Sequence, residues 1–183
     1  MPEREKMLAG APYDVTDPEL TAARLRARAL CQRFNALPAH TPEEERRALL
    51  QELTGAATDA YITPPFFCDY GAHILFGRSV YFNFNCVILD CARVTIGNHV
   101  LFGPAVQIYT ALHPMDADER RSGIESARPV VIGDDVWLGG GSIVCPGVNI
   151  GAGSVIGAGS VVTRNVPPGV FAAGNPCRVV RQL

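Results

Sequence analysis

His113 is the side chain of this sequence whose type and position best suit chemistry. It lies in the segment YTALHP, where a regular repeat gives way to a long irregular stretch, and Pro114 stiffens the turn that follows it. An imidazole titrates near neutral pH, so it can accept or donate a proton under ordinary conditions. The alternative interpretation is a structural loop histidine whose ring is held by a backbone carbonyl.

The other reactive side chains are weaker candidates. His40 lies between helical segments, and His73 and His99 occupy non-aliphatic positions of the repeat, so we expect most of them to be structural. The six cysteines are scattered, with no C-x-x-C pair. We interpret them as free thiols that pack as small hydrophobic side chains in a reducing cytoplasm, and we expect no metal site.

The element that must position His113 is a six-residue repeat, clearest between Val130 and Pro167. Cut from Ile132, it reads IGDDVW, LGGGSI, VCPGVN, IGAGSV, IGAGSV and VTRNVP. Six residues suit one flat face of a triangular coil, with an aliphatic side chain inward and Gly, Asn or Asp at the corner. Three steps complete a turn, and each turn buries one more aliphatic layer against the last.

The same period begins earlier and is interrupted once. It starts at Phe76 and Phe82, holds at Ile88, gains two residues and resumes as IGNHVL and FGPAVQ. We predict a local bulge near Val94 and Thr95. Residues 109–131 show no six-residue period and are rich in Pro, Asp, Arg and Ser. A long loop in a compact domain is usually functional, so we expect this excursion to matter.

Residues 1–60 are helical in character, and we divide the chain into this segment and a repeat domain over residues 61–183. Asp17 and Pro18 predict a helix start, and apolar residues then recur at helical spacing from Leu20 to Leu37. A second capping signal, Thr41-Pro42 with Glu44, predicts another helix that ends near Gly55. We expect Tyr61, Ile62, Phe66 and Phe67 to cover the open end of the coil.

Composition limits the classes of function. The chain has 183 residues, 48% of them hydrophobic, and a formal net charge of −2, which predicts no broad affinity for nucleic acid. The first ten residues lack the apolar run of a signal peptide, and no stretch is long enough to span a bilayer. We therefore expect a cytoplasmic protein. No P-loop is present, and GAGSVIGAG is part of the repeat rather than a nucleotide motif.

The repeat resembles that of the hexapeptide-repeat acyltransferases, and the resemblance implies a mainly β, left-handed parallel β-helix with an N-terminal helical segment and a long loop near residues 109–131. The general rule for parallel crossovers is right-handed, so the handedness is implied by the resemblance alone. CDYG, NFN, the HP of YTALHP, VWLGG and GNPCR together are similar to the sugar O-acetyltransferases, most of all the maltose type. The galactoside and nodulation-type acetyltransferases are near relatives of the maltose type.

That resemblance implies an activity and its residues. The enzymes are acetyl-CoA-dependent homotrimers with active sites between subunits, and they require no metal. His113 matches their general base, which takes a proton from a sugar hydroxyl as that hydroxyl attacks the thioester directly; Gly139 and Gly140 would let a backbone N–H reach the oxyanion. Asp69, Asn83 and Asn85 match acceptor-binding positions. Asp69 and Asn83 also suit a turn cap and a coil corner.

Cofactor contacts carry over in the same way. The positions that match the family's CoA contacts are Gly140, Ala158, Thr163, Arg164, Arg178 and Arg181. Arginine suits phosphate through its planar donor fork, although ordinary surface charge is the alternative. Cys91 stands where the galactoside type has a carboxylate, which argues against galactoside specificity. Trp137 either walls the active site or packs between coils.

Three other hypotheses stay open. The acceptor could instead be a galactoside, a nodulation-type glycan, an antibiotic hydroxyl or an amine, a choice that we expect the loop at residues 115–128 to influence. A γ-class carbonic anhydrase would share the coil and bind zinc through three histidines, but its histidine pair five positions apart is missing here. A non-catalytic module that only trimerises would leave His113 and the late arginines without a role.

Overall fold

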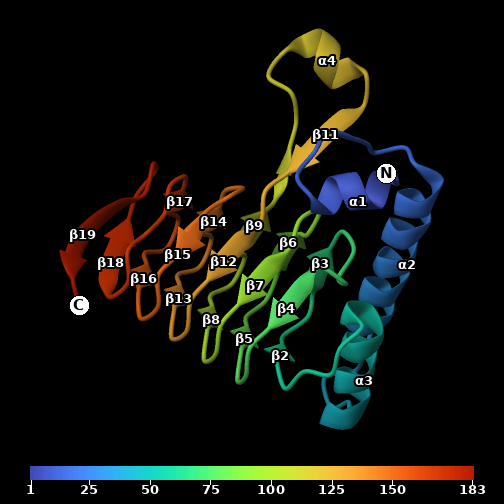
Figure 1. Cartoon of the computed structure of the whole chain (residues 1–183). Coiled ribbons are helices and arrows are strands. Elements are labelled where there is room, and N and C mark those ends of the chain that lie inside the picture. Colours follow the sequence, from blue (N-terminus) through green and yellow to red (C-terminus); the bar gives the residue numbers. More distant parts are fainter.

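The six-residue steps wind into a coil with three flat faces, and each face is a parallel sheet, to which the last strand of the chain adds one antiparallel pairing. The structure is a computed structural model that describes residues 1–183, and it shows the predicted left-handed parallel β-helix (Figure 1). Each strand is short because two to four residues fill one face before the chain turns a corner. The coil is therefore a three-sided wall on which loops can be mounted.

The sheets differ in their number of strands. The seven-stranded sheet has the order β19-β18-β16-β13-β8-β5-β2, the five-stranded sheet β17-β14-β9-β6-β3, and the four-stranded sheet β15-β12-β7-β4. The strands of the first are β2 (Tyr61–Ile62), β5 (Tyr81–Phe82), β8 (Leu101–Phe102), β13 (Trp137–Leu138), β16 (Val155–Ile156), β18 (Val170–Ala173) and β19 (Arg178–Gln182). Those of the second are β3 (Phe66–Cys68), β6 (Cys86–Leu89), β9 (Gln107–Tyr109), β14 (Ile143–Val144) and β17 (Val161–Val162). Those of the third are β4 (Ile74–Phe76), β7 (Val94–Ile96), β12 (Val130–Ile132) and β15 (Asn149–Ile150).

Inward side chains stack from turn to turn and form one continuous core. The Phe82 and Phe102 rings lie parallel with centroids 3.9 Å apart, and Phe66 packs edge-on against Phe82. Such pairs add to the burial of the aliphatic columns on the other faces. The corners take residues with positive φ, among them Asn85 and His99, so His99 is an exposed corner residue.

The two extra residues lie in a corner rather than in a strand. Val94 pairs with Ile74, twenty positions earlier, and Val131 pairs with Asn149, eighteen positions later. β7 is in register with both of its neighbours, so the predicted bulge near Val94 and Thr95 is wrong. The two extra residues lie within the segment 90–93, between β6 and β7. The preceding turn also has two extra residues, within the segment 69–73. Because both turns are lengthened equally, β4 and β7 stay in register.

Helices close the first end of the coil. α2 (Pro18–Asn35) begins at Asp17, whose side chain accepts the N–H of Leu20 as predicted, and it packs against β3. α3 (Glu43–Thr54) ends at Gly55 in the left-handed conformation, also as predicted. Its predicted capping signal is wrong, because the Thr41 hydroxyl donates to the Pro38 carbonyl and no side chain caps the helix.

The residues expected to cover the coil instead form its first turn. Ile62 and Phe66 point into the core, while Tyr61 and Phe67 lie on the outside and are about half exposed. The cover is made by leucines of α2 and α3 that belong to the same core cluster. Helices replace aromatic side chains here because an amphipathic helix covers more of an open end than one strand can.

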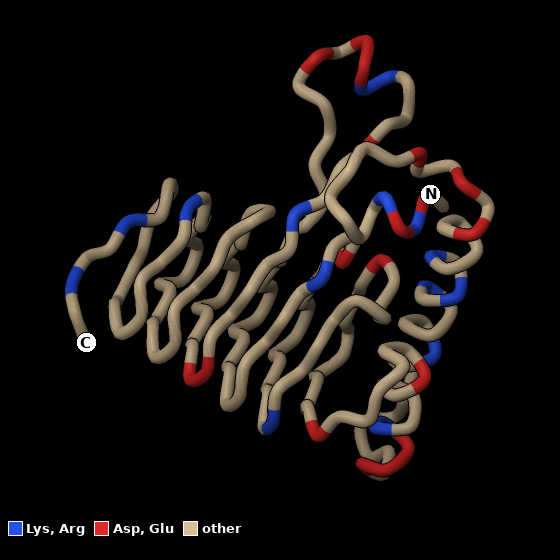
Figure 2. Tube along the Cα trace, viewed as in Figure 1, with Lys and Arg blue, Asp and Glu red and all other residues tan.

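The irregular stretch leaves the coil after β9 and returns at β12, as predicted (Figure 1). It contains β10 (Ala111–Leu112), α4 (Ala117–Arg121) and β11 (Ile124–Ala127). β11 pairs with β10 and with β1 (Tyr13–Asp14), which follows α1 (Glu3–Leu8), so the start of the chain is tied to the loop. Charged residues gather on the helices and this loop, whereas the coil carries few (Figure 2). None of the helices has the length and apolar character needed to cross a bilayer.

Candidate functional site

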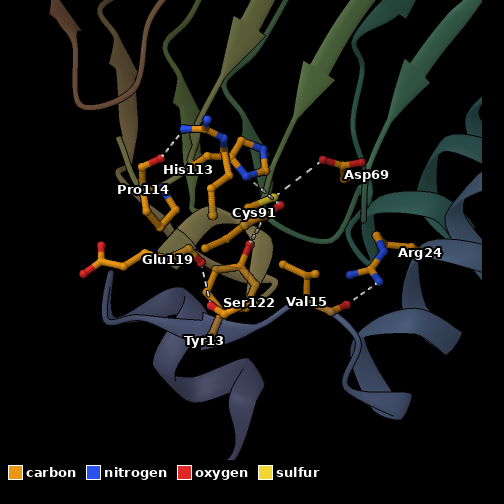
Figure 3. A network of polar contacts seen from close by, with 11 residues as sticks. Tyr13, Val15, Arg24, Asp69, Cys91, His113, Pro114, Glu119 and Ser122 are labelled. Atoms are coloured by element: carbon orange, nitrogen blue, oxygen red, sulfur yellow. Dashed lines mark hydrogen bonds and ion pairs between the residues drawn. The ribbon is translucent and has the colours of Figure 1, made fainter. Parts of the chain in front are cut away.

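Three insertions leave the coil at one corner. Residues 69–73 join β3 to β4, residues 90–93 join β6 to β7, and residues 110–129 join β9 to β12. Because β3, β6 and β9 are successive strands of the five-stranded sheet, the insertions stack at the edge where its strands end. We call this edge the insertion corner. It gathers Asp69, Cys91 and His113, which Figure 3 shows in one region of the molecule.

Asp90 organises the first two insertions. Its fully buried carboxylate accepts the backbone N–H groups of Asp69, Tyr70 and His73 at 2.8–3.2 Å. Burial raises the pKa of Asp90 to about 6, although the N–H groups of Tyr70 and His73 act in the opposite direction. The His73 Nδ1 atom lies 2.7 Å from the Asp90 carbonyl oxygen. His73 is therefore a buried residue with a structural role, and burial lowers its pKa.

His113 is held by a carboxylate that the sequence did not point to. Its side chain is 58% exposed, and its Nδ1 atom lies 3.5 Å from Glu125 Oε1. The Tyr13 hydroxyl donates to Glu125 Oε2 at 2.8 Å. Tyr13 and Glu125 are direct partners in the antiparallel pairing of β1 with β11. The buried N-terminal strand thus fixes the carboxylate that faces the imidazole.

His113 and Pro114 lie between two hollows. The first, of about 360 Å³, holds three titratable side chains in an otherwise largely apolar surface and is lined by Pro12, His113, Pro114, Glu119, Ile124, Glu125 and Ser126. The second, of about 410 Å³, is more apolar and is lined by Leu89, Tyr109, Ala111, Leu112, His113, Pro114, Met115, Arg120 and Pro146. The imidazole therefore faces a space that contains two carboxylates on one side and a more apolar space on the other. A further hollow of about 540 Å³ beside α3 is lined by no histidine or cysteine.

Asp69 lies beside Cys91, whose Sγ donates to Asp69 Oδ2 at 3.5 Å. Burial raises the pKa of Asp69, while the Cys91 hydrogen bond and the charges of Arg24 and Arg28 lower it. Burial, and next the Asp69 charge, raise the pKa of Cys91 to about 12. Cys91 is consequently a protonated donor to Asp69 at neutral pH. A carboxylate at position 91 would instead repel Asp69.

Asn83 and Asn85 lie at the opposite edge of the same sheet. They fall between β5 and β6, where the seven-stranded and five-stranded sheets meet. The Asn83 Oδ1 atom accepts the N–H of Phe84, and Asn85 adopts a left-handed φ of 61°. We call this edge the tight corner. Within one chain, these two asparagines and His113 are separated by the width of the sheet.

Gly140 and Ala158 continue the tight corner towards the C-terminus. The turns are in close contact there, since a Cβ added to Gly139 would lie 2.5 Å from the Ala158 nitrogen. Thr163 and Arg164 follow β17, on the insertion-corner edge two turns beyond His113. Arg178 and Arg181 are exposed on β19 at the far end (Figure 2). A single chain does not bring all six residues together.

Two remaining expectations are resolved by position. Trp137 is 52% exposed on the outer face of β13, between Leu101 and Val155 of the neighbouring strands, so packing between coils is excluded. The residues whose role sequence reasoning missed are Tyr13 and Glu125, which lie 112 positions apart and meet only through the pairing of β1 with β11. No group of three His, Cys, Asp or Glu side chains is arranged to hold a metal ion.

Comparison with known proteins gives matches over nearly the whole chain. The family model described as the maltose acetyltransferase hexapeptide capping motif matches residues 6–57, and bacterial transferase hexapeptide (six repeats) matches residues 129–164. Nodulation protein L of Rhizobium meliloti (strain 1021) is 51% identical over 177 residues, covering 97% of each chain.

Solved structures match equally well. A maltose O-acetyltransferase from Clostridium difficile 630 superposes with a TM-score of 0.97 at 44% identity, covering 100% of this chain and 98% of that one. A hexapeptide-repeat-containing acetyltransferase of Vibrio cholerae O1 biovar eltor, complexed with acetyl coenzyme A, gives 0.91 at 42% identity, covering 100% and 99%.

Proposed function

The chain belongs to the hexapeptide-repeat acetyltransferases of the maltose acetyltransferase type, and on this premise we propose that it transfers the acetyl group of acetyl-CoA to a hydroxyl of a small sugar. The observation that carries the proposal is the position of His113 between two hollows, facing Glu125. Acetyl-CoA as the donor agrees with the complex of the Vibrio cholerae relative and with the predicted cytoplasmic location.

The proposed reaction is direct attack. The Glu125 carboxylate, 3.5 Å from Nδ1 of His113, favours a proton on that nitrogen, which leaves Nε2 as the basic atom. Nε2 takes the hydroxyl proton of the acceptor as its oxygen forms a bond to the thioester carbonyl carbon. The tetrahedral intermediate then collapses, the C–S bond breaks, and the proton on Nε2 passes to the leaving CoA sulfur. No covalent acyl-enzyme is formed, and no metal takes part.

Acceptor binding is assigned to Asp69 at the insertion corner and to Asn83 and Asn85 at the tight corner. Asp69, which already accepts a hydrogen bond from Cys91, can accept one from a sugar hydroxyl as well, since a carboxylate has several acceptor sites. The side-chain amides of Asn83 and Asn85 can both donate and accept hydrogen bonds. The separation of these asparagines from His113 within one chain supports an active site between two copies.

We propose a homotrimer in which the tight corner of one copy faces the insertion corner of the next. An outward row on the seven-stranded sheet, with Tyr61, Leu101 and Trp137 each about half exposed, supports association of copies. In this arrangement Gly140 and Ala158 border the pantetheine arm. Thr163, Arg164, Arg178 and Arg181 are available to its phosphate groups.

The test is a screen of acceptors with release of free CoA as the readout. The panel contains mono- and disaccharides, amino sugars and hydroxylated antibiotics, each at the same acetyl-CoA concentration. CoA release that requires a glucose- or maltose-type sugar, with product mass increased by one acetyl group, supports the proposal. Release only with a galactoside, a nodulation-type glycan, an antibiotic or an amine would contradict the proposed acceptor class.

A further inference from the structure

Two buried thiols touch each other where the helical cap meets the coil. Cys31 lies in the second half of α2 and Cys68 ends β3, and their Sγ atoms are 3.7 Å apart. Both side chains belong to the main core, with 3% and 7% of their surface exposed. Neither residue has a part in the proposed acetyl transfer, although Cys68 directly precedes Asp69.

The other four cysteines are not arranged in this way. Cys86 donates to the Gly103 carbonyl oxygen and Cys91 to Asp69, and neither Cys145 nor Cys177 lies in hydrogen-bond contact with another thiol. The contact between Cys31 and Cys68 is thus the one place in the fold where two sulfur atoms face each other. It is also independent of how copies associate, because both thiols lie inside the core of one chain.

We infer that Cys31 and Cys68 form a modification site, in which a hydroperoxide converts the dithiol into a disulfide that fastens α2 to β3. The Cys31 thiolate attacks one peroxide oxygen, the O–O bond breaks, and Cys31 becomes a sulfenic acid as the first water leaves. The Cys68 sulfur then displaces the sulfenic hydroxyl and gives up its proton. Each sulfur loses one electron, and one hydrogen peroxide is reduced to two waters.

The order of the two steps follows from the hydrogen bond within the pair. Either sulfur can be the donor of the hydrogen bond that joins the two thiols, and this bond lowers the pKa of Cys31. The pKa of each of the other five cysteines is raised, with burial among the causes every time. The reactive thiolate therefore forms first at Cys31, and its neighbour is already in place to resolve the sulfenic acid.

The bond would join two elements that are far apart in sequence. Cys31 and Cys68 are separated by 37 positions, a segment that contains all of α3. A cross-link over such a loop reduces the freedom of the unfolded chain and stabilises the cap. Oxidation should therefore raise the thermal midpoint by on the order of 10 °C, and a reducing agent should reverse the change.

The experiment treats the full-length protein with a small excess of hydrogen peroxide and then with catalase. The protein is denatured, alkylated with iodoacetamide and weighed by mass spectrometry, before and after reduction. We expect two of the six thiols to be protected from alkylation and a peptide that links Cys31 to Cys68. The Cys31→Ser variant should lose the cross-link, whereas Cys177→Ser, which alters an unpaired thiol, should keep it.

Either of two results would overturn the inference. One is wild-type protein with six alkylatable thiols after peroxide treatment. The other is a disulfide that maps to different cysteines or persists in Cys31→Ser. If Cys31→Ser does not fold, the peptide map of the wild-type protein decides whether the disulfide forms. Separately, equal thermal midpoints for oxidised and reduced samples would show that the cross-link does not stabilise the cap.

Discussion

The two edges of the five-stranded sheet are built from the same strands and differ in almost everything else. At the tight corner the chain turns through short segments of Gly, Ala, Asn and Pro, and successive turns approach so closely that a methyl group on Gly139 would meet backbone. At the insertion corner the first three turns carry extra residues, and these hold Asp69, Asp90, Cys91 and His113. The tight corner repeats similar small residues from turn to turn, whereas the insertion corner has segments of different length and composition.

The contrast shows how a repetitive scaffold acquires a site. Stacking fixes both edges of the wall, so an insertion in one turn lies directly beside an insertion in the next. Residues that are twenty or more positions apart then meet without any change in the coil. The tight corner is constrained by packing, whereas the insertion corner is constrained by hydrogen bonds to Asp90 and by the pairing of β1 with β11.

The largest effect is expected at the insertion corner, from loss of the proposed base. His113→Ala should lower kcat by roughly 10²–10⁴-fold with acetyl-CoA and an accepted sugar, because the proton of the attacking hydroxyl has no other acceptor. The side chain is mostly exposed, so the thermal midpoint should stay close to that of the wild type. Steady-state kinetics with release of CoA as the readout measures kcat, and circular dichroism measures the thermal midpoint. Undiminished turnover would remove His113 from the mechanism.

The buried carboxylate at the same corner should make stability depend on pH. Its pKa is about 6 in the folded chain against 3.8 for an unperturbed group, so the folded state binds this proton more tightly. The contribution is complete below about pH 4 and is lost as the pH rises to about 6, at a cost of roughly 3 kcal/mol in unfolding free energy. Denaturant unfolding of wild type and Asp90→Asn across this range, at one protein concentration, measures the difference. Parallel curves would show that the group ionises freely in the fold.

The tight corner should respond to size rather than to charge. Gly139→Ala places a methyl group 2.5 Å from the Ala158 nitrogen, and we expect it to lower the unfolding free energy by about 3 kcal/mol. The control is Gly123→Ala in the loop, where a methyl group meets nothing within 4 Å and only the positive φ opposes it, at about 1 kcal/mol. Equal losses in the two variants would mean that the tight corner yields as easily as the loop.

The smallest effect tests the carboxylate that faces the imidazole. Glu125→Gln should lower kcat about tenfold, the equivalent of roughly 1.4 kcal/mol, because a neutral amide supports the imidazolium less well than a carboxylate. Glu119→Gln is the matched control: Glu119 lines the same hollow without contacting His113, so kcat should change less than about twofold. If Glu125→Gln and Glu119→Gln have the same kcat, Glu125 does not act through His113.

Local patterns predicted the scaffold and missed the contacts that organise the site. The aliphatic period from Ile132, the start of α2 at Asp17 and the end of α3 at Gly55 are all written in neighbouring residues. The hydrogen bond between Tyr13 and Glu125 spans 112 positions, and no local pattern encodes it. The bulge near Val94 was wrongly predicted for a related reason. The matching insertion at residues 69–73 is recognised only when the turns are stacked.

The proposed trimer requires the two edges to meet between copies of the chain, and mixed oligomers can show whether they do. His113→Ala and Asn83→Ala chains are each purified, unfolded together in equal amounts, refolded and assayed for acetyl transfer. If each site takes His113 from one copy and Asn83 from the next, random mixing restores roughly a quarter of wild-type activity. If both residues act within one chain, the mixture stays as inactive as the two separate variants, and the account is contradicted.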